Sequence, residues 1–253
     1  MTAGRDEKSG EMFPMISTMG MSGLLVTFGH ELSEAANRAA LAFRAAIERA
    51  DLQGIEETAA SLTSVFLRFD PLHFTHEAIL QQARAVLEDR NWYDAELPDG
   101  RRRWIVPAAF GGDAAPKLAE AAALAGRSPE DAVAELTERP LRVLTIGFAP
   151  GLPYMGFLPD RWNIPRQTTL TDQVPASAVV VAVRQLIIFS TPTPTGWRHI
   201  GQTCFRGFRP EDDDPFVLRS GDEVLLEPIS TETLARLKSD NATNGGARWE
   251  PIK

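Results

Sequence analysis

Side chains that could bind a small polar ligand are concentrated between residues 147 and 203 of this 253-residue chain. The stretch is rich in Gly, Pro, Tyr and Trp, which is typical of short strands joined by tight, shaped loops. An arginine can clamp a carboxylate through two parallel hydrogen bonds, and a glutamine offers both a donor and an acceptor. We therefore predict a site for a small anion. Its candidate binding residues are Tyr154, Arg166, Arg184, Gln185, Trp197 and Arg198.

Arg166, which follows a proline, is the first choice for the carboxylate clamp, and Arg184 and Arg198 are next. The alternative for each arginine is structural: its aliphatic stem covers the rim of a barrel while the charge stays in water. Tyr154 and Trp197 likewise suit either ligand contact or packing at a barrel end. The residue types leave both roles open.

Glycines and prolines in the same stretch are suited to shape the backbone around an anion, because glycine lets N–H groups approach without a Cβ in the way. The stretch lacks the Gly-x-x-x-x-Gly-Lys-Ser/Thr sequence of a nucleotide-binding loop. It is therefore a weak indication of phosphate binding. The backbone-shaping candidates are Gly147, Pro150, Gly151, Gly156 and Gly196.

Cysteine and histidine are scarce, with one Cys and four His in the chain. A single cysteine cannot form an internal disulfide, and the sequence has no Cys/His cluster at metal-ligand spacing, so we predict no metal site. Cys204 near His199 would allow a nucleophile pair, but we favour a small buried cysteine in a strand. No catalytic residue is assigned from the sequence.

The formal charge of −8 is distributed unevenly. Residues 141–210 carry seven arginines against two aspartates, so a basic island coincides with the candidate site. We expect no nucleic-acid partner, because the whole chain is acidic and has no block of five or more Lys/Arg. We also expect no membrane partner and a cytoplasmic location, because no apolar run is long enough for a bilayer and the first residues do not resemble a secretory signal.

The elements that must position this site begin with a ferredoxin-like domain. Residues 1–20 are polar and aperiodic and are expected to be a disordered tail. Residues 21–110 contain, in order, a strand at 23–28, a helix at 33–50, a strand or hairpin at 58–69, a helix at 75–90 and a strand at 102–108. This order predicts an antiparallel sheet with both helices on one face.

A β-barrel domain is predicted to follow. Residues 111–140 form a helical connector, in which Ser128-Pro-Glu-Asp is a strong helix start. Residues 141–238 contain several β-rich runs, and helical periodicity is absent until residue 231. Residues 239–253 form a C-terminal tail, either frayed or a late strand. The predicted fold class is therefore α+β.

Six sequence pieces stand in a characteristic order along the chain. They are IVPAAFGGD (105–113), GFAPGLPYMGFL (147–158), PRQ (165–167), VPA (174–176), A-x-x-Q (182–185) and TGWRHIGQT (195–203). Together they resemble the allophanate hydrolase subunit 1 family, which includes one component of the bacterial 5-oxoprolinase and the sporulation-kinase inhibitors. The resemblance covers most of residues 20–230, and the chain looks like a divergent member.

The resemblance implies a ferredoxin-like domain followed by a cyclophilin-like β-barrel. It implies a subunit of a heteromeric ATP-dependent amidohydrolase that opens a small cyclic or linear amide, with ATP bound by this subunit or elsewhere in the complex. Implied partners are a second subunit with a related cyclophilin-like fold, a third lactam-utilisation subunit as a further candidate, and a small anionic amide substrate. Gln185 could then bind the substrate amide or, alternatively, pair a strand edge. The other branch of the family implies a non-catalytic regulator, such as a histidine-kinase inhibitor.

The chain departs from the family pattern at the candidate site. Gln167 stands where a second arginine usually follows Arg166, and Val180 and Val183 stand where glycines are common. Side chains then occupy positions where the backbone could have met a ligand. Because valine suits a strand better than glycine does, the fold is expected to persist while the ligand changes or disappears.

Overall fold

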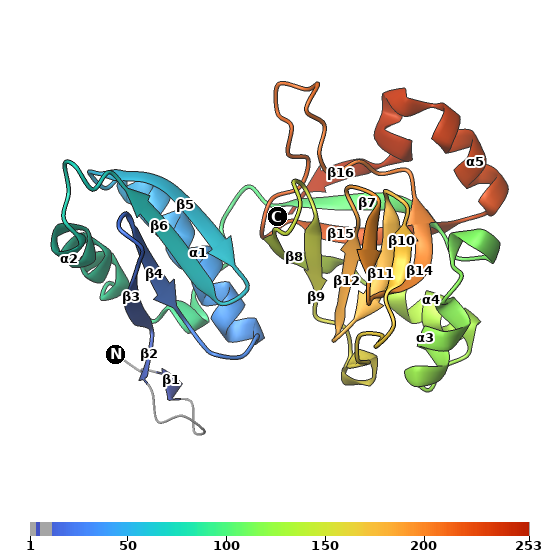
Figure 1. Ribbon diagram of the computed structural model, residues 1–253, viewed down its shortest axis with the longest axis horizontal. Helices are drawn as coiled ribbons and strands as arrows, with labels where there is room; N and C mark the ends of the chain where they lie inside the picture. Colours follow the sequence, from blue (N-terminus) through green and yellow to red (C-terminus); the bar gives the residue numbers. More distant parts are fainter. Residues whose placement is uncertain (1–3, 6–11, 253) are drawn as a thin grey trace. The chain divides into compact units, whose positions relative to one another are not determined.

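The computed structural model describes residues 4–5 and 12–252, and the chain divides into two compact units at the Asp99–Gly100 bond (Figure 1). Both units combine helices with mainly antiparallel strands, which confirms the predicted α+β class. Within residues 4–5 and 12–252, no helix is both long and apolar enough to cross a bilayer. Residues 1–3 and 6–11 of the predicted N-terminal tail lie outside the described residues.

A four-stranded antiparallel sheet in the order β3-β4-β6-β5 forms the centre of the N-terminal unit. Its strands are β3 (Met15–Met19), β4 (Gly23–Thr27), β5 (Ile55–Ser61) and β6 (Ser64–Phe69). The other elements of the unit are the short strands β1 (Gly4–Arg5) and β2 (Met12–Phe13), the helices α1 (Glu34–Ala50) and α2 (His76–Leu87), and the 3-10 turn η1 (Trp92–Asp94).

The two helices cover the same face of this sheet. Leu24 of β4 and Leu67 of β6 are directly opposed and share a face. Both belong to one buried core with Phe43 of α1 and Ile79 of α2. The antiparallel pairing and the helices on one face are those that the sequence pattern predicts for a ferredoxin-like unit.

The strand beside β4 differs from the expected one. The sequence pattern predicts residues 102–108 in this sheet, but they form β7 (Arg102–Ala109) of the C-terminal unit. The place beside β4 is taken by β3, a segment expected to be part of the tail. Hydrophobicity explains the difference: Trp104 and Val106 of β7 are buried, whereas β3 is mostly exposed, as suits an edge strand.

Seven strands close into a barrel in the C-terminal unit, in the order β14-β11-β12-β9-β8-β15-β7, with β7 pairing back to β14. Besides β7 they are β8 (Leu141–Ile146), β9 (Pro153–Gly156), β11 (Ala178–Ala182), β12 (Gln185–Ile188), β14 (Arg198–Thr203) and β15 (Glu223–Ile229). β7 and β15 run parallel, and the other neighbours are antiparallel. β16 (Arg248–Pro251) pairs with the first half of β7, so the C-terminal segment forms the late strand.

Short helices and a separate two-stranded sheet accompany the barrel. The helices are α3 (Leu118–Leu124), α4 (Pro129–Thr137) and α5 (Thr231–Ser239), with 3-10 turns η2 (Gly112–Ala114), η3 (Asp160–Trp162) and η4 (Asn241–Gly246). The hydroxyl of Ser128 accepts a hydrogen bond from the Asp131 N–H, which is the helix start predicted for α4. The separate sheet pairs β10 (Thr171–Val174) with β13 (Thr193–Thr195).

Side chains from all seven strands fill the barrel and form one core with α3 and α4. Val179 and Val181 of β11 point into this core, as do Met155 of β9 and Leu186 of β12. Because successive residues of a strand point to opposite faces, the residues between them point outward. The outward residues are therefore the ones available to a site on the barrel wall.

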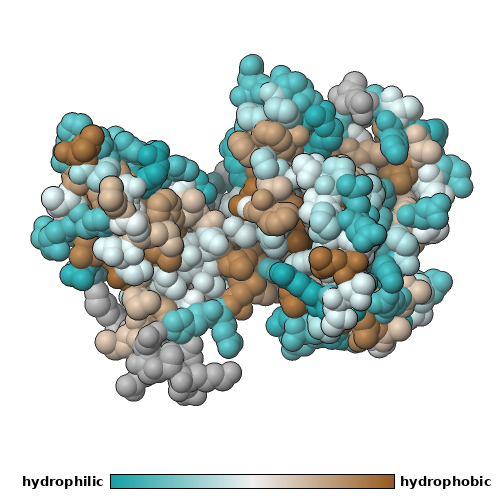
Figure 2. All heavy atoms as spheres, in the orientation of Figure 1, coloured by the Kyte–Doolittle hydropathy of each residue, from teal (hydrophilic) through white to brown (hydrophobic). Residues whose placement is uncertain are grey.

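Exposed apolar side chains do not single out a site. Figure 2 shows brown groups interspersed with teal ones over the visible face of both units. The most exposed large apolar residues, Leu72, Met21 and Phe148, come from separate loops and turns. Isolated apolar residues of this kind are normal on a protein surface.

Candidate functional site

A row of outward residues crosses four neighbouring strands of the barrel. Tyr154 of β9 is opposite Ile187 of β12, and Ile187 is in turn opposite Val180 of β11. Val180 is opposite His199 of β14. Directly opposed residues share a face, so this row lies on one face, together with Gln185, two residues from Ile187.

This face is covered by other parts of the chain. Val180, Ile187 and Trp197 belong to a buried cluster that also contains Val174 of β10. The β10–β13 sheet therefore packs against the outside of the barrel through Val174. We call this region the covered face; it comprises Tyr154, Val180, Ala182, Gln185, Ile187, Trp197 and His199.

Arg166 brings a positive charge to the aromatic part of the covered face. Its guanidinium carbon lies 5.3 Å from the centroid of the Trp197 ring, in a cation–π contact. The Tyr154 ring meets Trp197 edge-on, with 6.2 Å between centroids. Burial raises the pKa of Tyr154, and the charge of Arg166 acts in the opposite direction. The structure thus brings three of the predicted binding residues together.

The loop that carries Arg166 is held on both sides. Arg198 donates from Nη1 to the carbonyl oxygen of Pro165 at 2.5 Å, and the Gln167 N–H donates to the carbonyl oxygen of Gly196 at 2.7 Å. A Cβ on Gly196 would approach the Gln167 carbonyl oxygen to 3.1 Å, so glycine permits this close contact. Arg166 therefore projects from a fixed backbone while its own charge remains exposed.

Arg198 is a candidate whose binding groups are already used inside the protein. Its side chain is buried, and besides Pro165 it contacts Glu120 of α3, with Nε 2.9 Å from Oε1. Lys117 and Arg198 together lower the pKa of Glu120. Arg198 is opposite Val181, which faces the barrel core, so it points away from the covered face.

Arg184 also lies away from the covered face. Val183 and Arg184 form the two-residue turn between β11 and β12, with φ angles of 42° and 63°. Arg184 donates from Nε to the carbonyl oxygen of Leu158 at 2.9 Å and lies 2.8 Å from the Asp160 carboxylate. The Val183 side chain is exposed, in the turn rather than on the covered face.

Gln185 is buried on the covered face without using its amide nitrogen. It is 6% exposed, and its Nε2 has no hydrogen-bond partner among the described residues. Gly156 packs beside it, because a Cβ there would be 3.7 Å from Cγ of Gln185. The amide is thus held in place by packing, with its nitrogen uncommitted.

The glycine-rich loop before β9 packs against another backbone segment at Gly151. A Cβ on Gly151, whose φ is 67°, would lie 2.4 Å from the carbonyl oxygen of Gly207. Gly147 has nothing within 4 Å of its Cβ position, and Pro150 is exposed. The backbone of Gly207 thus fills the space at Gly151, while the space at Gly147 is open.

Cys204 is half-buried and lies directly after β14, whereas a buried cysteine within a strand is expected from the sequence. Its Sγ lies 3.7 Å from the carbonyl oxygen of Leu234. Burial raises the pKa of the thiol, and Lys238 opposes this shift. A protonated thiol is a poor nucleophile. Among the described residues, no group of three or more His, Cys, Asp or Glu could hold a metal ion.

His199 is a residue of the covered face that is absent from the predicted binding set. It is 6% exposed, and its Nε2 has no hydrogen-bond partner among the described residues. The alternation of β14 could have pointed to it, because Ile200 beside it belongs to the barrel core. From the sequence, His199 is considered only as a partner of Cys204.

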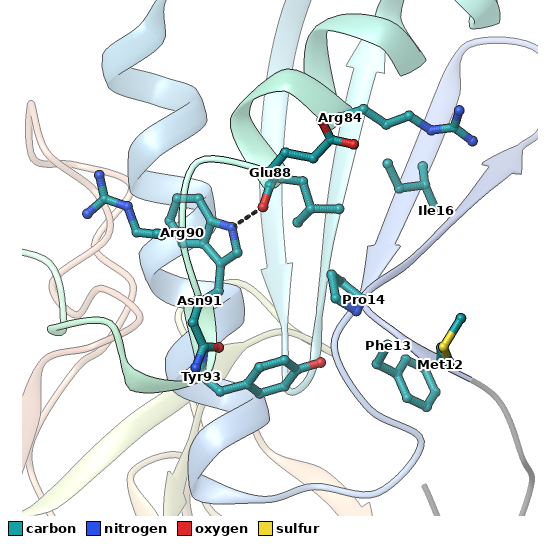
Figure 3. A pocket seen from close by; sticks show the side chains of 11 residues that line it. Met12, Phe13, Pro14, Ile16, Arg84, Glu88, Arg90, Asn91 and Tyr93 are labelled. Atoms are coloured by element: carbon teal, nitrogen blue, oxygen red, sulfur yellow. Dashed lines mark hydrogen bonds between the residues drawn. The ribbon is translucent and has the colours of Figure 1, made fainter. Parts of the chain in front are cut away.

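A separate pocket lies in the N-terminal unit (Figure 3). It has a volume of about 360 Å³ and is lined by Met12, Phe13, Pro14, Ile16, Arg84, Leu87, Glu88, Arg90, Asn91, Trp92 and Tyr93. The Trp92 ring N–H donates to the carbonyl oxygen of Leu87 at 2.8 Å, and the Tyr93 hydroxyl donates to that of Phe28 at 3.0 Å. Burial raises the pKa of Tyr93 to about 12. The predicted binding residues are not part of this pocket.

Comparison with known protein families matches residues 14–218 to the family described as carboxyltransferase domain, subdomains C and D. The chain is 30% identical to the 5-oxoprolinase B subunit of Bacillus subtilis (strain 168) over 233 residues, which are 89% of this chain and 97% of that protein. It is 36% identical to the 5-oxoprolinase B subunit of Escherichia coli O157:H7 over 140 residues, which are 55% of this chain and 64% of that protein.

Solved structures show the same fold inside longer chains. The structure of TTHA0988 matches with a TM-score of 0.68 and 29% identity, over 85% of this chain and 40% of that one. The urea amidolyase of K. lactis matches with a TM-score of 0.69 over 94% of this chain and 16% of that one. At 20% identity the second likeness shows the fold alone. In both structures the matched part is therefore less than half of the solved chain.

Proposed function

Because the chain belongs to the carboxyltransferase domain family, subdomains C and D, we propose that it is a subunit of a heteromeric ATP-dependent amidohydrolase of the 5-oxoprolinase type. The observation that carries this proposal is the match to nearly the whole of the 5-oxoprolinase B subunit of B. subtilis. The substrate would be a small anionic amide, cyclic or linear. We place this activity in the cytoplasm.

The covered face supports this substrate class. Arg166 is exposed at its edge and can clamp a carboxylate, and the Trp197 ring below the guanidinium helps to keep it in place. Gln185 has an uncommitted nitrogen that can donate to an amide oxygen. Tyr154, which is half-buried, offers a ring surface against which a small ring can pack, and Trp197 supports it edge-on. Each of these residues binds or orients the substrate.

ATP supplies the activation of the amide when it is bound, and we assign its binding to a partner subunit. The packed backbone at Gly151 favours this assignment, because the Gly207 backbone fills the space there. The longer chain of TTHA0988, of which this chain spans 40%, favours a function that needs further protein beside this one. We propose as partners a second subunit with a related cyclophilin-like fold and a third, lactam-utilisation subunit.

Reconstitution tests the proposal. The purified protein is mixed with the products of neighbouring genes that encode the second and third subunits, and ATP hydrolysis is measured with and without 5-oxoproline. Turnover of ATP that depends on 5-oxoproline is the expected result. A stable complex without such turnover would contradict the substrate, and the absence of any complex would favour the protein-binding regulator.

A further inference from the structure

Two nitrogens on the covered face are buried without a hydrogen bond among the described residues: Nε2 of Gln185 and Nε2 of His199. Leaving such a group unpaired costs about 1–3 kcal/mol in a folded protein. The proposed function gives Gln185 a partner in the substrate amide. The proposed function gives His199 no hydrogen-bond partner, so the unpaired imidazole nitrogen is still to be explained.

An irregularity in β14 directs His199 to this face. Val179 of β11 is opposite Gly201. The next residue of β11, Val180, is opposite His199, so one residue of β14 is left over between them. That residue, Ile200, belongs to the barrel core. A β-bulge of this kind re-aims a side chain and is common beside active sites.

Burial lowers the pKa of His199, against the opposing effect of hydrogen bonding with the Gly201 backbone and the Gln202 side chain. A neutral imidazole offers one N–H and one lone pair. Tyr154, on the same face, has a raised pKa. Among these described residues, His199 is the group suited to exchange a proton near neutral pH.

We infer that His199 is a catalytic residue of the covered face, with Nε2 directed at the amide of the bound substrate. In this role Nε2 takes a proton from water as the water oxygen bonds to the amide carbon. It returns that proton to the amide nitrogen as the carbon–nitrogen bond breaks. The amide and one water thus give a carboxylic acid and an amine, a second water is consumed as the ATP held by the partner subunit gives ADP and phosphate, and the imidazole returns to its starting state. The inference rests on the proposed function for the identity of the amide, but not for the placement of His199.

Nitrogen NMR of the histidine rings tests that placement directly. The chain has four histidines, and the other three, at positions 30, 73 and 76, all lie in the N-terminal unit, so the His199 ring reports on the barrel alone. The protein is labelled with ¹⁵N-histidine and titrated, with and without its partner subunit, with three compounds. They are 5-oxoproline, 2-pyrrolidinone, which lacks the carboxylate, and cyclopentanecarboxylate, which lacks the amide.

We expect the two lactams to shift the His199 ring signals and cyclopentanecarboxylate to leave them unchanged. A shift with 2-pyrrolidinone but none with 5-oxoproline would support the placement of His199 and contradict the 5-oxoprolinase substrate. If neither lactam shifts these signals in either condition, His199 does not face a ligand and the inference is overturned.

Two variants test the proton transfer. His199→Leu removes both ring nitrogens, and we expect an unchanged or higher Tm of the free protein together with loss of 5-oxoproline binding. Binding by both variants is measured by isothermal titration calorimetry, because neither variant keeps the ring that reports in the NMR experiment. His199→Gln keeps an N–H but cannot carry a proton, so we expect lactam binding with turnover at least ~100-fold lower in the reconstituted complex. The matched control is His73→Leu, at an exposed histidine of the N-terminal unit, with turnover unchanged. A lower Tm for His199→Leu with full turnover for His199→Gln would show that the imidazole is structural.

Discussion

The pocket of the N-terminal unit and the covered face of the barrel differ in what their polar groups do. In the pocket, Trp92 and Tyr93 donate to backbone carbonyl oxygens, and Asn91 donates to the Asp94 carboxylate. On the covered face, Gln185 and His199 each keep a buried nitrogen without such a bond. The pocket therefore has room but hydrogen-bonded ring and amide groups, whereas the covered face keeps two buried nitrogens without such bonds to described residues.

This difference indicates that the volume of a pocket is a poor guide to function in this chain. A hollow lined by satisfied groups is stable as it stands and gains little from a polar ligand. A buried donor without a partner raises the free energy of the folded protein, and a ligand that supplies the partner removes that cost. Substitutions in and beside the two regions test this contrast, from the largest expected effect to the smallest.

The largest effect is expected at Gly151, in the loop beside the covered face. Gly151→Ala combines a φ of 67° with a Cβ placed 2.4 Å from the Gly207 carbonyl oxygen. We expect a loss of about 3 kcal/mol or more in the free energy of unfolding, from left-handed strain and overpacking together. Urea unfolding measures it. Gly20→Ala in the N-terminal unit has a similar φ of 62° but open space, and we expect a loss of only about 1 kcal/mol. Equal losses would contradict the steric account.

Arg166→Ala tests whether the covered face binds an anion. We expect the affinity for 5-oxoproline to fall by about 1.5–3 kcal/mol, the value of a charge-assisted hydrogen bond, with an unchanged Tm because Arg166 is exposed. Isothermal titration calorimetry measures the affinity. Arg84→Ala, which removes an exposed arginine from the N-terminal pocket, is the matched control and should bind as the parent does. Equal affinity of all three proteins would exclude the clamp.

Removing a polar group should have opposite effects on stability in the two regions. Gln185→Leu deletes a buried amide whose nitrogen is unpaired among the described residues, so we expect the free energy of unfolding to rise by about 1 kcal/mol while 5-oxoproline binding is lost. Tyr93→Phe deletes a hydroxyl that donates to the Phe28 carbonyl oxygen, so we expect a fall of about 1 kcal/mol. Chemical unfolding of both variants gives the signs, and a loss at both positions would remove the contrast.

The smallest effect is expected at the turn between β11 and β12. Val183 has a φ of 42° and an exposed side chain, so glycine relieves strain there at little cost in packing. We expect Val183→Gly to raise the free energy of unfolding by about 0.5–1 kcal/mol and to leave ligand binding unchanged. Differential scanning calorimetry with and without 5-oxoproline tests both. A gain of affinity would restore the view that this side chain blocks a ligand.

The fold could be predicted from the sequence where periodicity and caps agree. Ser33, Thr75 and Ser128 each cap a helix that was expected from apolar spacing. The exchange of β3 for β7 in the N-terminal sheet was not predictable from local pattern, because both segments are β-compatible and the choice depends on which core buries Trp104. The pairing of strands that are distant in sequence depends on tertiary packing.

The candidate site was predicted in part. Arg166, Tyr154 and Trp197 lie together, because the PRQ loop and the β14 segment are joined by close backbone contacts that glycine allows. Arg184 looked equivalent to Arg166 in sequence, yet a left-handed turn directs it to Leu158. His199 was not selected, although its alternation with the apolar Ile200 could have placed it on the outward face.

Because β3 and not β7 completes the N-terminal sheet, the two units share no strand among the described residues. In the described chain, each sheet is built from strands on one side of the Asp99–Gly100 bond only. No sheet would lose a strand if the polypeptide were divided at that bond. The chain thus consists of two consecutive segments that each contain complete sheets. A gene rearrangement that moves one segment carries its sheets with it.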